Sequence, residues 1–193
     1  MSVKPILTEP NKLLRLISKP VESVGDDERK LMDDMLETMY AAPGIGLAAI
    51  QVGVPKRVIV LDLEWRNQSE STNDEKQAVR KNPMYFVNPE IITKSTNNST
   101  YEEGCLSVPG QFAEIERPDK CHVKYLDYYG LPKEIKAEGM LATCIQHEID
   151  HLDGKVFVDY LSQLKRDRIR KRLVRESHSE RPTGCDKENA PVI

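Results

Sequence analysis

The sequence has little that would suit a secreted or membrane-bound protein. No apolar run is long enough to cross a bilayer, and residues 1–5 lack the hydrophobic core of a signal peptide. The four cysteines have no paired spacing, so we expect them to be reduced thiols in a cytoplasmic protein. The net charge of −3 and the pI of about 5.9 give no indication of DNA or membrane binding.

Internal repeats are also lacking, which excludes a solenoid or propeller. A chain of 193 residues with 39% hydrophobic content suits one globular domain with a real core and some polar extension. We predict a single catalytic domain over residues 1–175. The polar residues 176–193 are predicted to be a disordered tail.

Only four histidines occur, and two of them form the pattern His-Glu-x-x-His at His147, Glu148 and His151. In an α-helix, residues four apart lie about 40° from each other on one face, so both imidazoles can reach one metal ion. Glu148 would flank His151, where its carboxylate can touch a metal-bound water without being a ligand. An accidental pairing on a surface helix is the less favoured alternative.

A catalytic zinc-type site takes three protein ligands and leaves one position open. A large class of metalloproteases continues the motif to a third histidine, and this chain follows that pattern as far as Gly154 but has Phe157 at the last position. The apolar residues 156–158 offer no carboxylate. The third ligand is therefore expected upstream, within residues 103–107 (Glu-Gly-Cys-Leu-Ser).

Two cysteines compete for that role. Cys144 precedes His147 by three residues, but three ligands along one helical stripe would span roughly 10 Å of the axis. Bonds of about 2.0–2.3 Å to one ion cannot cover that span. Cys144 is therefore expected in the pocket wall, whereas Cys105 can approach the ion from a strand or loop. The remaining cysteines and histidines are expected to bind no metal: Cys121, Cys185, His122 and His178.

Three segments, in order and spacing, resemble the signature segments of the peptide deformylase family. They are residues 44–51 (Gly-Ile-Gly-Leu-Ala-Ala-Ile-Gln), residues 103–107 and residues 147–151 (His-Glu-Ile-Asp-His). The likeness extends from near the start to about Arg175. It implies a metal-dependent hydrolase that removes the formyl group from the N-terminal formyl-methionine of newly synthesised polypeptides and releases formate. It also agrees with Cys105 as the third metal ligand.

The resemblance further implies how the site works. Glu148 would take a proton from the water and return it to the leaving amine. The Gln51 side-chain amide and the Leu106 backbone N–H would donate to the developing oxyanion. The peptide would lie as an added strand near Gly46, and Asp150 is expected to pair with Arg117. Residues implied to bind the substrate are Gly44, Ile45, Gly46, Tyr101, Met140, Thr143 and Cys144.

The glycines of residues 44–46 also resemble part of a phosphate loop, but they lack the third glycine of a dinucleotide fingerprint. We interpret them as positions where a backbone approaches a ligand closely. Two imidazoles and a thiolate suit Fe²⁺, Zn²⁺, Ni²⁺ or Co²⁺, and the affinity order does not choose among them. The resemblance favours Fe²⁺ in the cell, with zinc second.

Residues 164–175 carry seven lysines and arginines against a single acid, Asp167. A solvated helix is the simpler interpretation. Bacterial members of the resembled family dock a C-terminal helix on the ribosome, however, so we expect a salt-sensitive contact with ribosomal RNA here.

Two other classes of protein stay open at this point. A zinc endopeptidase could use the same His-Glu-x-x-His motif, although Phe157 occupies the third-ligand position of one protease class. A non-catalytic protein stabilised by a metal would need a closed site with a fourth soft ligand. That ligand is missing unless Cys144 joins the other three.

The order of patterns predicts an α+β fold in which antiparallel β-sheets wrap around a central metal-binding helix. Residues 64–82 are predicted to be a long polar insertion anchored by Trp65. Helices are expected at 26–41, at 139–152 and, at the C-terminal end, from a cap at Ser162 to about Arg175. Strands are expected at 56–63, 85–92, 112–115, 120–129 and 132–137, with 56–63 central because its apolar run is continuous.

Overall fold

A computed structural model describes residues 2–65 and 81–178. Its helices are α1 (Asp26–Ala41), α2 (Gly139–Leu152) and α3 (Gln163–His178), with short 3-10 helices η1 (Lys12–Arg15), η2 (Ala49–Val52) and η3 (Phe157–Tyr160). Its strands are β1 (Gly46–Ala48), β2 (Val58–Leu61), β3 (Met84–Lys94), β4 (Asn98–Cys105), β5 (Val108–Pro118), β6 (Lys120–Leu126) and β7 (Pro132–Glu138). This mixture of helices and antiparallel strands confirms the predicted α+β class.

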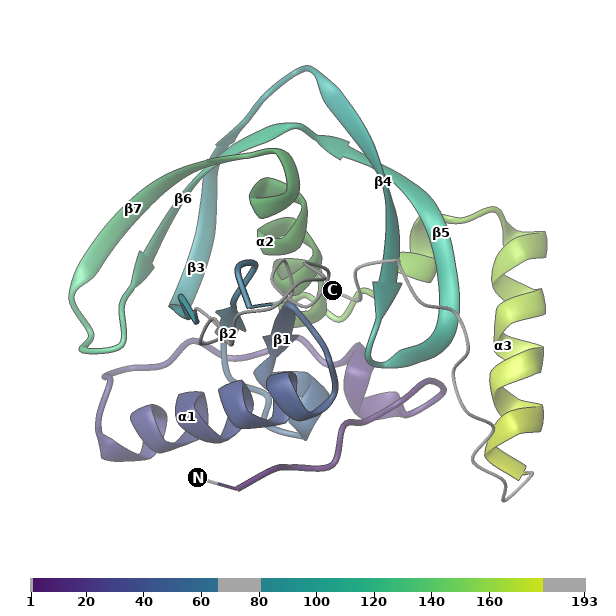
Figure 1. The fold of residues 1–193 in the computed structure, drawn as a ribbon, viewed down its shortest axis with the longest axis horizontal. Helices are drawn as coiled ribbons and strands as arrows, with labels where there is room; N and C mark the ends of the chain where they lie inside the picture. Colours follow the sequence, from purple (N-terminus) through teal and green to yellow (C-terminus); the bar gives the residue numbers. More distant parts are fainter. Residues whose placement is uncertain (1, 66–80, 179–193) are drawn as a thin grey trace, which may run out of the picture.

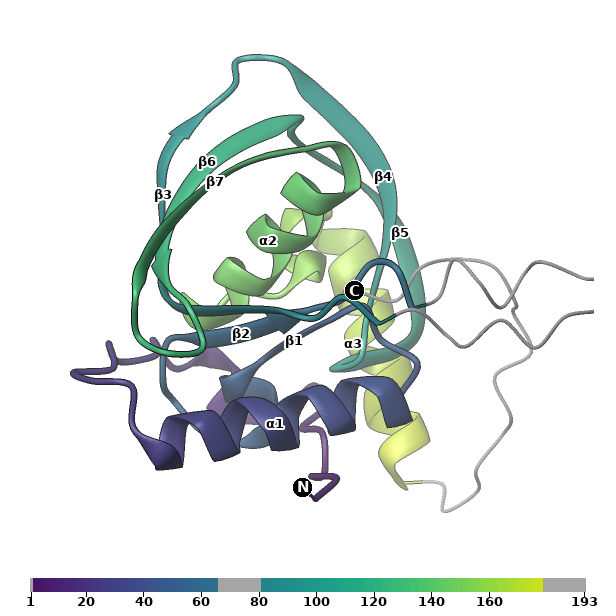
Figure 2. The same cartoon turned by 60° about the vertical axis from the view of Figure 1, so that its left-hand side comes forward.

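The strands form two antiparallel sheets that enclose α2. One sheet has the strand order β1-β2-β3-β6-β7, and the other is the β4–β5 ribbon. Figures 1 and 2 show both sheets arching over α2, with α1 on the opposite side of β1 and β2. Helix α2 contacts strands of both sheets. The helix that carries the His-Glu-x-x-His motif is therefore at the centre of the described fold.

The continuous apolar run of β2 follows from its position between two helices. Val58 and Val60 belong to the core cluster on the α1 side, whereas Ile59 and Leu61 belong to the cluster on the α2 side. A strand covered on both faces needs apolar side chains at every position. β2 has β1 and β3 as neighbours, so it is an interior strand as predicted, although β3 holds the middle of the sheet.

The helix predicted at 26–41 is confirmed at both bounds as α1. Acidic side chains occupy its first turn, where the helix dipole favours them. Its apolar stripe packs on β1 and β2 through Leu31, Met32, Met35 and Met39. The C-terminal helix expected after a cap at Ser162 is also present and begins at Gln163, but it continues to His178, three residues beyond the predicted end at about Arg175.

The other predicted strands correspond to β3, β5, β6 and β7, but β1 and β4 have no counterpart among the predictions. Most of β4 reads Asn-Ser-Thr-Tyr-Glu-Glu, which lacks the apolar alternation of a half-buried strand. β4 is extended because it pairs with β5 along almost its whole length. β1 is three residues long and is held by β2. Both strands therefore depend on partners that are distant in sequence.

Trp65 contacts the chain before β1. Its indole Nε1 donates a hydrogen bond to the carbonyl oxygen of Gly44 at 2.9 Å. Its ring meets that of Tyr40 edge to face, with 5.2 Å between centroids. The predicted anchoring role of Trp65 is consistent with these contacts. Most of the insertion, residues 66–80, lies outside the described residues, as does the predicted tail from residue 179 onward.

The N-terminal segment is tied to α1 by the buried carboxylate of Asp34. This carboxylate accepts hydrogen bonds from Lys30 Nζ at 2.7 Å and from the Ser2 backbone N–H at 2.8 Å, and Lys4 Nζ lies 3.7 Å away. The hydrogen bond from Lys30, followed by that from Ser2, lowers the pKa of Asp34 from 3.8 to about 2. The charged form therefore stabilises the folded state.

We predict that Asp34→Asn lowers the free energy of unfolding by roughly 1 kcal/mol at pH 7, because the ionised acceptor is lost. Because the folded pKa is depressed, the stabilisation is complete above pH 3.8 and is lost as the pH falls toward 2. Urea unfolding at pH 7, 4 and 2.5 should show that the free energies of unfolding of the wild type and of Asp34→Asn converge as the pH falls. Asp26→Asn, at an exposed position of the same helix, is the control and should cost less. A difference that stays constant across this pH range would contradict the prediction.

Candidate metal centre and active site

Helix α2 is apolar and buried around most of its circumference, yet it carries a polar cluster. Residues from Ala142 to Ile149 are all buried, as are His151 and Leu152. A helix enclosed on all sides can keep polar side chains only where they find partners. The polar members of α2 are therefore the natural place to look for a ligand site.

The two helical histidines meet a cysteine from the β4–β5 ribbon. Cys105 is the last residue of β4, and its Sγ lies 3.2 Å from His151 Nε2. Ligand atoms of Cys105, His147 and His151 all lie within 4.8 Å of one another, and all three side chains are buried. Cys144 is buried as well but is not part of this group.

The donor set fits a divalent metal ion. Tetrahedral bonds of about 2.0–2.3 Å would separate a sulfur from a nitrogen ligand by roughly 3.5 Å, close to the observed sulfur–nitrogen distance. His147 Nε2 is buried and has no hydrogen-bond partner within residues 2–65 and 81–178, which would cost about 1–3 kcal/mol if nothing bound it. Burial lowers the pKa of His151 well below its usual value, so its imidazole is neutral. Burial raises the pKa of Cys105, so its thiolate requires a nearby cation.

Glu148 has the properties of a proton carrier. Its two carboxylate oxygens are buried and have no hydrogen-bond partner among the described residues. Burial raises the pKa of Glu148 well above its usual value, although Arg117 opposes that shift. A buried carboxyl group with a raised pKa beside a metal site is the arrangement that general acid–base chemistry uses.

Gly46 of β1 lies directly against Glu148. A Cβ atom at this position would come within 2.5 Å of Glu148 Oε1 and 2.8 Å of a Leu61 methyl group. A Cβ on Gly44 would likewise lie 2.7 Å from Leu106 Cδ1. We expected these glycines to let the backbone approach a ligand closely. In the structure they let it approach the side chains of Glu148, Leu61 and Leu106. Each glycine makes room for a predicted site residue.

Gln51 follows β1 in η2 and points toward Cys105. Its Oε1 accepts the Ala48 backbone N–H at 2.8 Å, which fixes the orientation of the amide. Its Nε2 donates to Ser107 Oγ at 3.1 Å and lies 3.7 Å from Cys105 Sγ. Leu106 directly follows Cys105 in the chain. Both predicted oxyanion donors therefore border the candidate metal ligand.

His147 is supported by a carboxylate that the sequence reasoning missed. Its Nδ1 lies 2.8 Å from Glu103 Oε2, and Glu103 is bound by Arg117 at 2.6 Å and 3.0 Å. Burial would raise the pKa of Glu103, but its hydrogen bonds with His147 and Arg117 outweigh that effect and lower it to about 2. The expected pair between Asp150 and Arg117 is present at 2.7 Å. The sequence offered no clear signal for this role, because Glu102 and Glu103 are adjacent acids and their order alone does not show which of them faces α2.

The residues expected to bind the substrate are partly brought together. Ile45 and Cys144 belong to one buried apolar cluster, and the half-buried Met140 packs against it. The Thr143 hydroxyl is buried and finds no hydrogen-bond partner in the described part of the chain. The hydroxyl of Tyr101 lies near Gly139, at the start of α2. The roles of Tyr101 and Thr143 in substrate binding stay predictions.

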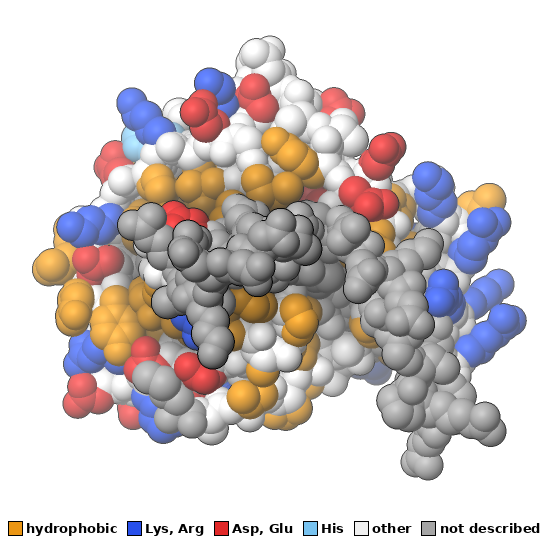
Figure 3. Space-filling model, in the orientation of Figure 1, with side chains coloured by type: hydrophobic (Ala, Val, Ile, Leu, Met, Phe, Trp, Pro, Cys, Tyr) orange, Lys and Arg blue, Asp and Glu red, His pale blue; other side chains and the backbone are white. Residues whose placement is uncertain are grey.

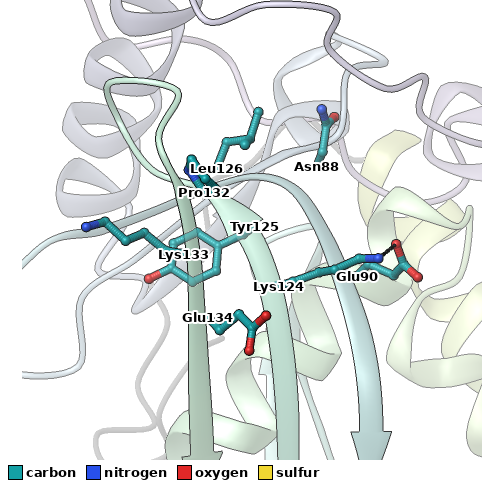
Figure 4. Close-up of a pocket in the computed structure, with 8 residues that line it drawn as sticks. All are labelled: Asn88, Glu90, Lys124, Tyr125, Leu126, Pro132, Lys133 and Glu134. Atoms are coloured by element: carbon teal, nitrogen blue, oxygen red, sulfur yellow. Dashed lines mark ion pairs between the residues drawn. The ribbon is translucent and has the colours of Figure 1, made fainter.

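A separate pocket of about 480 Å³ lies on β3, β6 and β7 (Figure 4). Its lining contains none of the predicted site residues. Lys124 and Glu90, which line it, pair with each other at 2.9 Å. The residues around the pocket are Asn88, Glu90, Lys124, Tyr125, Leu126, Pro132, Lys133 and Glu134.

A buried His-Glu-x-x-His helix whose two histidines could hold a metal ion together with a cysteine on a neighbouring strand is the arrangement typical of a metal-dependent hydrolase. Comparison with known proteins gives the family: a model of polypeptide deformylases matches residues 3–167. The chain belongs to the polypeptide deformylase family. Members of this family are enzymes that remove the N-terminal formyl group of nascent peptides, so the resemblance is confirmed and the endopeptidase alternative loses its support.

Individual relatives agree with this assignment. A peptide deformylase of Pelagibacter ubique is 66% identical over 173 residues, which are 90% of this chain and 94% of that protein. The crystal structure of the Ehrlichia chaffeensis peptide deformylase is similar with a TM-score of 0.81 and 45% identity, over 93% of this chain and 99% of that one. The same enzyme in complex with actinonin matches with a TM-score of 0.82 and 46% identity, over 93% and 100%.

We predict that Cys105→Ser removes the bound metal and the activity, because a neutral hydroxyl is a much poorer ligand than a thiolate. Cys144→Ser is the matched control, since it makes the same atomic change at another buried cysteine one helical turn from His147. It should retain the metal. Metal content per protein molecule, measured after desalting, distinguishes the two variants. Metal loss from the Cys144 variant with retention by the Cys105 variant would reverse the assignment.

Proposed function

We propose that this chain hydrolyses the formyl amide of N-formyl-methionyl peptides at the centre formed by Cys105, His147 and His151. The observation that carries the proposal is the unpartnered, buried carboxylate of Glu148 beside those three ligand atoms. When bound, a divalent ion would supply Lewis-acid activation of both water and the formyl carbonyl. Fe²⁺ is our first expectation for this ion, and Zn²⁺, Ni²⁺ and Co²⁺ suit the same donor set.

Different protein groups transfer the proton and stabilise the negative charge. Glu148 takes one proton from the attacking water and delivers it to the nitrogen of the leaving amine as the C–N bond breaks. The Leu106 backbone N–H and the Gln51 amide donate to the negative oxygen that develops on the formyl carbon. Gln51 Nε2 donates one hydrogen to Ser107 Oγ at 3.1 Å and directs the other at Cys105 Sγ at 3.7 Å, a long contact in which the oxyanion would replace the sulfur as acceptor. The products are formate and a free N-terminal amine.

Substrate binding is proposed along β1 and the start of α2. β1 is an edge strand whose described hydrogen-bonded neighbour is β2, so a peptide can add on its free side near Gly44 and Gly46. The apolar cluster that contains Ile45, Met140 and Cys144 offers a surface for the methionine side chain. We keep Tyr101 and Thr143 as further members of that pocket.

The setting of the reaction is also part of the proposal. We propose that residues 1–175 act as one catalytic domain in the cytoplasm, on polypeptides leaving the ribosome. The packing of Ile169 and Leu173 of α3 with Phe157 and Val158 supports including this helix in the domain. Among the residues that the structure describes, no helix has the length and apolar character needed to cross a membrane.

We predict that Glu148→Gln retains metal and fold but lowers kcat by about 10²–10⁴-fold, because an amide of the same shape cannot take the proton. The KM for a formyl-methionyl peptide should change little. Protein should be purified anaerobically, analysed for metal and assayed for formate release. Glu148→Asp should recover little activity, since its shorter side chain misplaces the carboxylate. Wild-type turnover by metal-loaded Glu148→Gln would overturn the mechanism, and absence of formate release by the wild type would overturn the function.

A second proposal concerns α3 and the ribosome. Figure 3 shows lysine and arginine side chains gathered over α3, at the right of the view. Leu173 is buried and Ile169 is half-buried against η3, whereas Lys165, Arg168 and Lys171 are exposed on the outward part of the helix. Such a surface can bind RNA phosphates through salt-sensitive contacts.

We predict that reversing three exposed charges, Lys165→Glu, Arg168→Glu and Lys171→Glu together, weakens cosedimentation with ribosomes. The apolar contacts of α3 are retained, so the fold and formate release should be unchanged. Lys120→Glu, Lys124→Glu and Lys133→Glu together are the matched control on the five-stranded sheet. Cosedimentation that is independent of salt, or equal for both triple variants, would exclude a contact through α3.

A further inference from the structure

A chain of polar contacts leads from the surface of the protein to His147. The Tyr160 hydroxyl donates to Asp150 Oδ2 at 2.8 Å, and Arg117 Nη1 donates to the same oxygen at 2.7 Å. Arg117 also binds Glu103, with 2.6 Å from Nε to Oε1 and 3.0 Å from Nη2 to Oε2. Glu103 Oε2 in turn meets His147 Nδ1 at 2.8 Å. The whole chain uses five side chains from four elements: β4, β5, α2 and η3.

Burial decreases steadily along this chain. The side chain of Glu103 is 0% exposed and that of Arg117 is 4% exposed, whereas Asp150 is 14% exposed. Tyr160 is half exposed. Ionised groups with so little solvent depend on one another for their hydrogen bonds, because water cannot replace a lost partner. A change at Tyr160 should therefore alter the hydrogen bonds of Glu103 and His147 at the buried end of the chain.

The Arg117 side chain fixes the orientation of the Glu103 carboxylate. Its guanidinium is planar and binds both oxygens of Glu103, so a rotation of the guanidinium would rotate the carboxylate that holds His147. Two groups restrain that plane from the outer side. Asp150 accepts a hydrogen bond from the third nitrogen of Arg117, Nη1. The guanidinium carbon also lies over the Tyr160 ring, 4.9 Å from the ring centroid.

Tyr160 has a second connection to the site through its own segment. Phe157 begins η3, and its ring stacks on that of His147 with 6.3 Å between centroids and 22° between planes. Phe157 occupies the position where some metalloproteases have a third histidine, yet here it forms an apolar wall for a ligand. η3 thus touches His147 directly through Phe157 and through the polar chain that starts at Tyr160.

We infer that Tyr160 is a positioning residue for the metal ligand His147. Its hydroxyl holds Asp150 Oδ2, which holds the Arg117 plane, so that Glu103 keeps His147 Nδ1 engaged and Nε2 directed toward Cys105 and His151. Removing the hydroxyl leaves Asp150 with one donor fewer and allows the guanidinium to turn. The expected consequence is a less well held imidazole and therefore a more weakly held metal ion. The activity readout of this inference rests on the proposed function, whereas the metal readout does not.

Tyr160→Phe tests the inference because it removes the hydroxyl and keeps the ring over Arg117. Partners behind a metal ligand typically contribute 10–100-fold to affinity or activity, and the Tyr160 hydroxyl acts three steps beyond the direct partner of His147, which is Glu103. We therefore expect release of Co²⁺ to a chelator to accelerate several-fold, up to about tenfold. The visible absorption of the Co²⁺-loaded protein should also shift, and kcat should fall with KM unchanged. Tyr129→Phe, at a tyrosine that is 72% exposed, is the matched control and should behave as the wild type.

A double-mutant cycle separates positioning from general stability. If Tyr160 acts through Asp150, then Tyr160→Phe should add nothing to metal release once Asp150→Ala is present. Additive effects, wild-type metal release, or a lower melting temperature with unchanged release would each overturn the inference. Faster release from Tyr160→Phe in a protein that produced no formate would support this inference while refuting the proposed function.

Discussion

The burial of a polar helix segment is the constraint on which the rest of the structure depends. His147, Glu148 and His151 are shielded from solvent by strands of two sheets, and buried polar atoms are costly when they lack partners. His147 Nε2 and both oxygens of Glu148 have no hydrogen-bond partner in the part of the chain that the structure describes. The site is therefore energetically incomplete by itself, and a metal ion with a substrate would supply the absent partners.

The β4–β5 ribbon provides the other half of this arrangement. It contributes Cys105 to the ligand set, Glu103 to His147 and Arg117 to Glu103. Arginine suits this place because its fork binds one carboxylate through two nitrogens and leaves a third for Asp150, which a lysine ammonium could not do with the same geometry. The contact between Arg117 and Glu103 lies within the ribbon, whereas those of Cys105 with His151 and of Glu103 with His147 exist only when the ribbon packs against α2.

Local patterns predicted the fold where each element buries a periodic face. The apolar stripe of α1 matches the one face that this helix buries, and the continuous apolar run of β2 matches its burial on both faces. These two elements were therefore predictable. β4 was not, because its residues are mostly polar and it owes its extended form to pairing with β5. The role of Glu103 was missed for the same reason, because it depends on the pairing of β4. Two adjacent acids stand at 102 and 103, and only the strand register shows that Glu102 is exposed whereas Glu103 faces His147.

The sequence by itself determined the relation of His147, Glu148 and His151, because residues four apart share a face in any α-helix whatever surrounds it. It also disfavoured Cys144 as a third ligand, since the helical rise sets that distance. Cys105 was named from the sequence by elimination and by resemblance, but how closely any group outside the helix approaches the two histidines was decided by tertiary structure alone. The positions of Cys105, of the Glu103 carboxylate and of the Tyr160 hydroxyl depend on how β4, β5 and η3 pack around α2. Those are distances through space between residues far apart in the chain, and no local spacing encodes them.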